Sequence, residues 1–331
     1  MAAHLRPAAS ATAQRQPGGG GETDTAVPAV RRRSPLTSAT RFGGYLYVGP
    51  SVLFLVLLSI YPLLYTVQLS TTDVRAGEQF FVGLTHYAAL WRDPWFWNSA
   101  KLDLIFSVAS TIFHLGLGFA FATLLNQAWP SLWLRNLFRG LLILPWVFST
   151  AASGLMWTLL YHPFGILNYF WIAILKQSDP LEFLAQPGMA LVSLTVVNTW
   201  KAYPIYMIFI LGGLQAIPHE LYEAAKVDGA SAWQRFMNVT VPQLRTVLLA
   251  ISSLDFVTTM GHVDLIRLLT RGGPLQSTET TPFYIFKTAL IDGNLGYGAA
   301  IATLLMVALA IFTVFYLRML SRGTESDGTS F

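Results

Sequence analysis

The sequence contains no cysteine and little charge. Without cysteine the chain can form no disulfide, no thiolate metal ligand and no cysteine nucleophile. Charged residues make up 11% of its 331 residues, less than half of the roughly 25% that is typical of soluble globular proteins. No lysine follows a glycine, so the chain cannot form a phosphate-binding loop of the Walker A type. Water is therefore not expected to be its main solvent, and ATP is not expected to bind to it.

Signals for catalysis and for nucleic-acid binding are also missing. No Gly-x-Ser-x-Gly elbow occurs, and His219 and Glu220 do not begin a zinc motif because residue 223 is glutamate. The net charge is only +4. The one basic cluster, the arginines at 31–33, lies just before the first apolar stretch and is interpreted as a membrane topology signal. The sequence predicts no enzyme, no bound cofactor or metal, and no nucleic-acid partner.

Six long apolar stretches dominate the chain, in which 53% of residues are hydrophobic. Each is long enough, as a helix, to cross the roughly 30 Å hydrocarbon core of a membrane. The predicted spans cover residues 44–69, 99–126, 137–160, 189–213, 243–269 and 298–320. The fifth carries several charges, and a water-exposed helix is its alternative; its length and position favour a membrane helix that faces a polar pathway. The predicted fold class is an all-α integral membrane protein with six transmembrane helices.

The distribution of positive charge predicts the orientation of these spans. With six spans, most Lys and Arg residues of the loops fall on the side of the two termini, so both termini are expected in the cytoplasm. Residues 1–41 are predicted to be a disordered cytoplasmic tail because they are too polar and too rich in Gly and Pro to build a core. Residues 42–320 form the predicted membrane domain, and residues 321–331 a cytoplasmic C-terminal tail.

A charged, alanine-rich segment, EAAKVDGASAW at residues 223–233, interrupts the apolar chain between the fourth and fifth spans. Pro218 suits the first turn of a helix, and Gly229 suits a left-handed residue at a helix end. Ser231 with Gln234 has the spacing of a capping box that opens a second helix. The segment is therefore predicted to fold as helix, turn and helix. Its expected docking surface for another protein has apolar anchors at Tyr222, Val227, Trp233 and Phe236.

Several motifs resemble one family. EAA-x-x-DGA, followed by F-x-x-x-x-x-P, resembles the cytoplasmic coupling loop of ABC importer permeases. LFRGLLILPWV and LTRGGPLQSTETTPFYIFKTAL resemble the sugar-uptake permeases of the maltose and glycerol-3-phosphate type, and the likeness covers about residues 42–320. LTRGGP followed by ST is similar to the first of the two paired permease subunits. Arg271 departs from the pattern, because the family usually has a small residue there.

The resemblance implies a permease that moves a carbohydrate inward by alternating access, in a bacterial or archaeal cytoplasmic membrane. Besides membrane lipid, it implies as partners a second permease subunit, two ATP-binding subunits that use ATP and Mg²⁺, and an extracytoplasmic sugar-binding protein. The coupling loop would be residues 214–242. The residues that couple to the ATPase would be Glu223, Ala224, Ala225, Asp228, Gly229 and Ala230. The alternative is a self-contained, ion-coupled secondary transporter or channel, with Asp255 and Asp264 as ion-coupling carboxylates.

Polar side chains within the spans are candidates for the transport path, because charges inside a membrane are costly and face a cavity or pair with each other. The candidates are Asn198, Lys201, Asp255, His262 and Asp264. Asp255 and His262, seven residues apart, are expected on one helix face. The alternative is structural pairing, of Lys201 with Asp255 or of Asp264 with Arg267. His114 is expected to be a packed or interhelical hydrogen-bonded histidine.

Overall fold

A computed structural model describes residues 38–75 and 77–327. Most of the predicted N-terminal tail lies outside this range, although residues 38–41 already belong to helix α1 (Ser38–Leu55). The chain divides after Leu57 into two compact units, which are described separately. The first contains α1, and the π-helical segment η1 (Val56–Ile60) leads on to α2 (Tyr61–Leu69) in the second.

The described part of the second unit is mostly helical, and it contains one β-hairpin that the sequence did not predict. The hairpin pairs β1 (Thr72–Arg75) with the antiparallel strand β2 (Glu78–Phe81). The remaining α-helices are α3 (Thr85–Trp91), α4 (Pro94–Leu125), α5 (Leu132–Val147), α6 (Thr150–Leu160), α7 (Ile166–Tyr169), α8 (Met189–Ala216), α9 (His219–Val227), α10 (Ala232–Arg235), α11 (Val241–Thr259), α12 (Asp264–Leu269), α13 (Thr281–Phe286) and α14 (Leu295–Asp327). The described residues of this unit also form three π-helical segments: η2 (Phe170–Ile174), η3 (Phe236–Thr240) and η4 (Lys287–Ile291).

Helices α4 and α8 make the most extensive contact in this unit, and α11 packs against both. Tyr206, Met207 and Ile210 of α8 are almost completely buried in the core that they share with α4. Gly118 lets the two helices approach closely, because a Cβ atom at this position would lie 2.3 Å from the Cβ of Tyr206. Small residues that allow such backbone contact are common where membrane helices pack.

Four helices in the described part of the chain are long and apolar enough to cross a membrane: Tyr47–Leu69, Pro94–Leu125, Met189–Ala216 and Leu295–Leu320. They correspond to the first, second, fourth and sixth predicted spans. The third is a pair of helices, α5 and α6, bent by 97°, which gives a fifth span if the pair is counted as one. The bend arises where Phe148 is extended and Ser149 accepts a hydrogen bond from the Ala152 N–H as the N-cap of α6.

The fifth predicted span, residues 243–269, is not one helix. α11 ends at Thr259, and α12 begins only at Asp264 after a turn. An acidic residue in the first turn favours a new helix start, since it interacts with the positive end of the helix dipole. The count of six spans therefore stays a prediction. At the C-terminus, α14 continues to Asp327, beyond the predicted end of the sixth span at residue 320.

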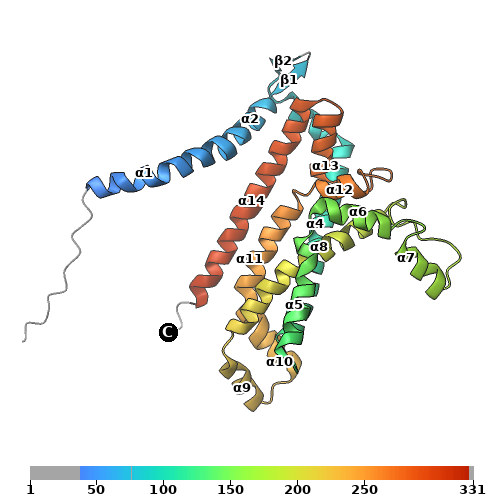
Figure 1. Ribbon diagram of the computed structural model, residues 1–331. Helices are drawn as coiled ribbons and strands as arrows, with labels where there is room; N and C mark the ends of the chain where they lie inside the picture. The colour runs from blue at the N-terminus through green and yellow to red at the C-terminus, as the bar shows by residue number, and fades with distance from the viewer. Residues whose placement is uncertain (1–37, 76, 328–331) are drawn as a thin grey trace, which may run out of the picture. The chain divides into compact units, whose positions relative to one another are not determined.

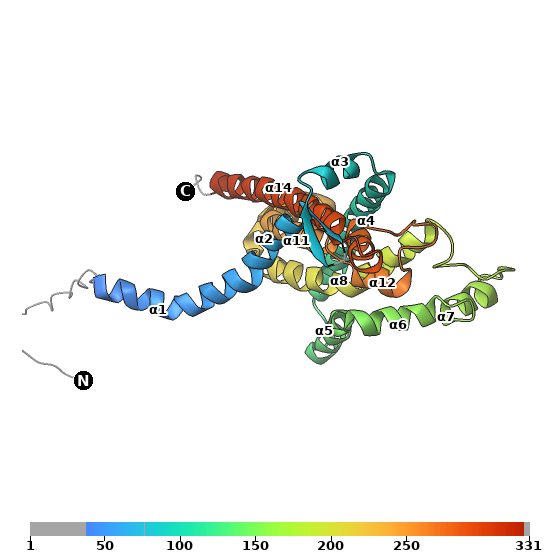
Figure 2. The same ribbon diagram turned by 90° about the horizontal axis from the view of Figure 1, so that it is seen from above.

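The short elements of the second unit gather at two opposite ends of its long helices. Figure 1 shows the hairpin, α12 and α13 at one end and α9 and α10 at the other. Seen from above, α6 and α7 extend sideways from the packed α4, α8 and α12 (Figure 2). The chain thus has two separate regions in which polar loops and short helices could meet partners.

Candidate functional site

The segment between α8 and α11 has the predicted helix, turn and helix. α9 ends in a Schellman motif: the Ala230 N–H donates to the Ala225 carbonyl at 2.9 Å, and the Gly229 N–H donates to the Lys226 carbonyl at 3.0 Å. Gly229 has φ +76°, the left-handed conformation that a side chain would disfavour. Both the helix end and its glycine are confirmed.

The second helix of the segment begins with the predicted capping box. The Ser231 hydroxyl accepts from the Gln234 N–H at 3.3 Å, and the Gln234 amide oxygen accepts from the Ser231 N–H at 2.7 Å. The Arg235 guanidinium also donates to the Ala230 carbonyl at 2.7 Å, which holds the turn against α10. These local bonds give the segment a defined shape.

Two of the four expected apolar anchors are exposed and two are not. Val227 and Trp233 are 87% and 68% exposed. Tyr222 is half-buried and its hydroxyl lies 3.0 Å from the Thr240 hydroxyl, while Phe236 packs edge-on against Phe119 of α4. The first pair is therefore available to a partner, whereas Tyr222 ties α9 to η3 and Phe236 packs against α4.

Glu223 carries an exposed negative charge on this surface. Its carboxylate accepts a hydrogen bond from the Lys226 ammonium at 2.8 Å and lies 3.6 Å from a ring nitrogen of His219. The hydrogen bond and charge of Lys226 hold the pKa of Glu223 below its usual value, so the carboxylate is ionised at neutral pH. Glu223 is thus an exposed negative group on the same segment as the two exposed apolar side chains, Val227 and Trp233.

A polar cavity of about 220 Å³ lies between the long helices. Four of the five predicted path residues line it, namely Asn198, Lys201, Asp255 and His262. Trp146, Thr150, Thr258 and Thr259 line it as well. Asp255 and His262 do not share a helix face as predicted, because α11 ends between them and His262 lies in the turn. Asp264 does not line the cavity. It lies in the first turn of α12, largely exposed, 3.8 Å from Arg267, as the structural alternative predicted.

The charged groups of the cavity are bonded to neighbours that the sequence did not identify. Asp255 accepts from the Thr111 hydroxyl at 3.1 Å and lies 2.9 Å from the Nδ1 of His114, both on α4. His114 is completely buried, and its interhelical hydrogen bond confirms the prediction for this residue. Lys201 does not pair with Asp255; it donates to the Phe148 carbonyl at 2.7 Å.

The cavity offers hydrogen-bond donors, acceptors and an aromatic ring. The side-chain nitrogen of Asn198 is buried without a hydrogen-bond partner. The Lys201 ammonium adds donors, Asp255 adds acceptors, the threonines add hydroxyls, and Trp146 adds an indole ring. Such a lining can bind a polyhydroxylated molecule. Within the described residues, no cluster of three or more His, Asp or Glu side chains could hold a metal ion.

Comparison with known proteins gives one family. Residues 114–326 match the model of the "Binding-protein-dependent transport system inner membrane component" family. A trehalose/maltose transport system permease protein, MalF of Thermococcus litoralis, is 33% identical over 83% of this chain and 92% of its own length. A lactose transport system permease protein, LacF of Rhizobium radiobacter, is 31% identical over 87% of this chain and 98% of its own.

A solved structure shares the fold. A chain of a bacterial ABC transporter involved in the import of the acidic polysaccharide alginate superposes with a TM-score of 0.74, at 21% identity, over 86% of this chain and 96% of that one. At this identity the likeness concerns the fold alone. The family match covers more than half of the sequence, and the relatives are aligned over most of their length. The chain belongs to the family of inner membrane components of binding-protein-dependent transport systems.

Proposed function

We propose that this chain is the permease subunit of an ATP-driven importer that carries a carbohydrate into the cytoplasm by alternating access. The main support is the exposed segment from α9 to α10, in a chain that belongs to a family of transport components and lacks a phosphate loop of its own. The relatives named for trehalose, maltose and lactose transport, and the polar lining around Asn198, support a carbohydrate as substrate.

In this proposal the chain works within a larger assembly. A second permease completes the pore, two ATP-binding subunits hydrolyse ATP with Mg²⁺, and an extracytoplasmic binding protein delivers the sugar. The assembly lies in a bacterial or archaeal cytoplasmic membrane, with both termini of this chain in the cytoplasm.

The coupling residues Glu223, Ala224, Ala225, Asp228, Gly229 and Ala230 would contact one ATP-binding subunit. Ala224 and Ala225 are small enough for close backbone approach, and Val227 and Trp233 would bury apolar surface against it. The ionised Glu223 carboxylate would meet basic groups or backbone amides. Since charge-assisted hydrogen bonds are strong once water is excluded, reversal of this charge should disrupt docking.

The substrate would pass the cavity of Asn198, Lys201, Asp255 and His262. Sugar hydroxyls could donate to Asp255 and accept from Asn198 and Lys201, and the Trp146 ring could cover a sugar face. Asp264, at the surface and beside Arg267, is the weakest member of the predicted set, because it does not reach this cavity.

The test is sugar-stimulated ATPase activity and uptake by the reconstituted assembly. Glu223→Arg and Gly229→Pro should abolish both, whereas Glu182→Arg, an exposed glutamate outside the segment, should leave them unchanged. Unaltered coupling in both loop variants would contradict the docking role. Uptake by the purified chain alone, driven by a proton or sodium gradient, would favour the secondary transporter instead.

A further inference from the structure

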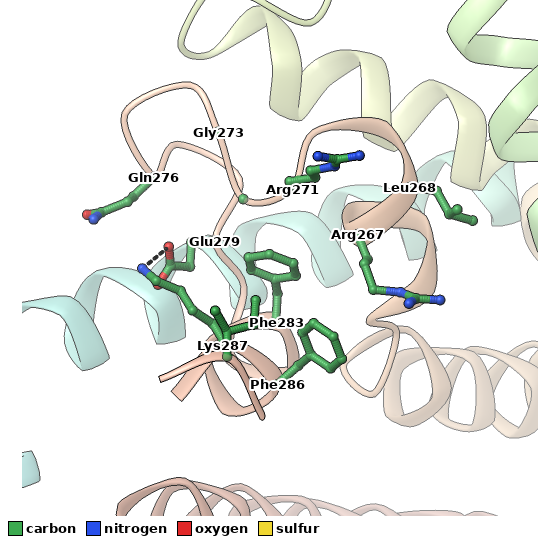
Figure 3. A pocket seen from close by; sticks show the side chains of 11 residues that line it. Arg267, Leu268, Arg271, Gly273, Gln276, Glu279, Phe283, Phe286 and Lys287 are labelled. Atoms are coloured by element: carbon green, nitrogen blue, oxygen red, sulfur yellow. Dashed lines mark hydrogen bonds and ion pairs between the residues drawn. The ribbon is translucent and has the colours of Figure 1, made fainter. Parts of the chain in front are cut away.

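A second and larger cavity, of about 630 Å³, lies between α12 and η4, at the end of the long helices opposite α9 and α10. It shares no lining residue with the cavity around Asn198. The residues that matter here are Arg267, Arg271, Glu279, Phe283, Phe286 and Lys287. Figure 3 shows the two phenyl rings between the Glu279 and Lys287 pair on one side and Arg267 on the other.

The cavity carries positive charge that is not neutralised. Glu279 is almost buried, and both of its carboxylate oxygens accept from the Lys287 ammonium, at 3.2 and 3.1 Å, so this pair is internally balanced. Arg267 has only a long, exposed ion pair with Asp264, at 3.8 Å. None of the ion pairs formed within the described ranges includes Arg271. Arg271 is therefore the group most available to an anion.

The backbone holds Arg271 at the cavity despite an unfavourable conformation. Its φ is +51°, in the left-handed region that favours glycine, and its N–H donates to the Ile266 carbonyl at 2.8 Å. Gly272, next in the chain, has no room for a side chain, because a Cβ atom would lie 2.6 Å from the Phe283 ring. Glycine would suit the backbone conformation of Arg271, so Arg271 can be replaced by glycine without backbone strain, and its guanidinium can be tested on its own.

Aromatic rings supply the apolar part of the cavity. The ring centroids of Phe283 and Phe286 lie 6.1 Å apart, and the Arg267 guanidinium lies 5.7 Å from the Phe286 centroid. A sugar ring can place its C–H face on such a surface, and a guanidinium can hold a carboxylate through two parallel hydrogen bonds.

We propose that this cavity binds a carbohydrate that carries a carboxylate, with Arg271 on the carboxylate, the two phenyl rings against the sugar, and Arg267 adding positive charge to the cavity. The proposal rests on the carbohydrate importer function proposed above and narrows the substrate class to acidic sugars. The cavity lies at the end opposite the coupling segment, so it acts as an entry subsite.

The experiment measures direct binding of digalacturonate and of neutral digalactose to the full transporter assembly in nanodiscs, without the binding protein. The unaltered assembly should bind digalacturonate about tenfold more tightly, as one charge-assisted bidentate contact provides. Arg271→Gly should abolish this preference without harming the fold, since glycine suits φ +51°. Arg271→Lys should restore part of it, and Arg92→Gln, an exposed arginine outside the cavity, should not change it.

Equal affinities for the two sugars in the unaltered assembly, or a preference that survives Arg271→Gly, would overturn the site. Weaker association with the binding protein in Arg271→Gly, with no change in sugar preference, would also overturn it in favour of a protein contact. Uptake of neutral sugar is measured in parallel. Uptake of neutral sugar by an assembly that shows no preference for digalacturonate would refute only the subsite. Failure to take up any sugar would refute the importer function independently.

Discussion

At the scale of single residues, Asp93 joins three helices. One carboxylate oxygen accepts from the Trp95 N–H at 2.9 Å and caps α4, and the other accepts from the hydroxyls of Tyr284 and Tyr297, each at 2.7 Å. We expect Asp93→Ala to destabilise the protein by about 2–4 kcal/mol, because a cap and two hydrogen bonds are lost. Tyr284→Phe should cost about 1 kcal/mol. Thermal unfolding in detergent measures both changes, and equal stabilities of the two variants would contradict the shared role of Asp93.

The same carboxylate should make stability depend on pH. Partial burial acts to raise the pKa of Asp93, but the hydrogen bonds from Tyr284, Tyr297 and the backbone outweigh it and hold the pKa below the usual 3.8. A lowered folded-state pKa means that the stabilisation is fully present above pH 3.8 and is lost as the pH falls through the lower folded value. Melting temperatures measured across this acidic range should fall less steeply in Asp93→Asn than in the unaltered protein.

At the scale of helices, the contact of α4 with α8 depends on Gly118. We expect Gly118→Ala to destabilise the protein by about 1–3 kcal/mol, because the added methyl group would overlap Tyr206. Gly116 is the matched control on the same helix, since a Cβ atom there would meet nothing within 4 Å. Gly116→Ala should be neutral or slightly stabilising through helix propensity. Equal effects of the two substitutions would show that helix propensity, and not close packing, dominates.

The bend between α5 and α6 should depend on Lys201. Its ammonium donates to the Phe148 carbonyl, which the break leaves without a helical partner. We expect Lys201→Met to destabilise the protein by about 1–2 kcal/mol, whereas Lys201→Arg should retain most of the stability because a donor remains. Thermal unfolding of the two variants tests this, and identical losses would contradict the role of the hydrogen bond.

Features set by neighbouring residues were predictable from the sequence, and features set by distant contacts were not. Ser231 and Gln234 are three residues apart, so their capping box was visible directly. The bond between His114 and Asp255 joins residues 141 positions apart, so only a lone histidine among apolar residues hinted at it. The end of α11 at Thr259 was missed because the length of the polar stretch suggested one continuous helix.

At the scale of the whole molecule, the absence of cysteine allows the predicted orientation to be tested without first removing native thiols. We expect Asn238→Cys, in η3 directly after α10, to react with an impermeant maleimide only from the cytoplasmic side. Glu78→Cys in the hairpin should react only from the opposite side, because the hairpin and α10, which η3 follows directly, lie at opposite ends of the long helices. Labelling of intact cells and of inverted vesicles distinguishes the two sides. Reaction of both residues from one side would refute the orientation.

The position of α11 has a mechanical consequence. The helix begins directly after η3 and carries Asp255 near its other end. Its 19 residues form a rod roughly 28 Å long. Under the proposed function, a displacement of α9 and α10 by a partner would act on this rod at one end and reach the polar cavity at the other. Such a movement of α11 would have to break the hydrogen bond between Asp255 and His114 or carry α4 along with it, because that bond joins the two helices.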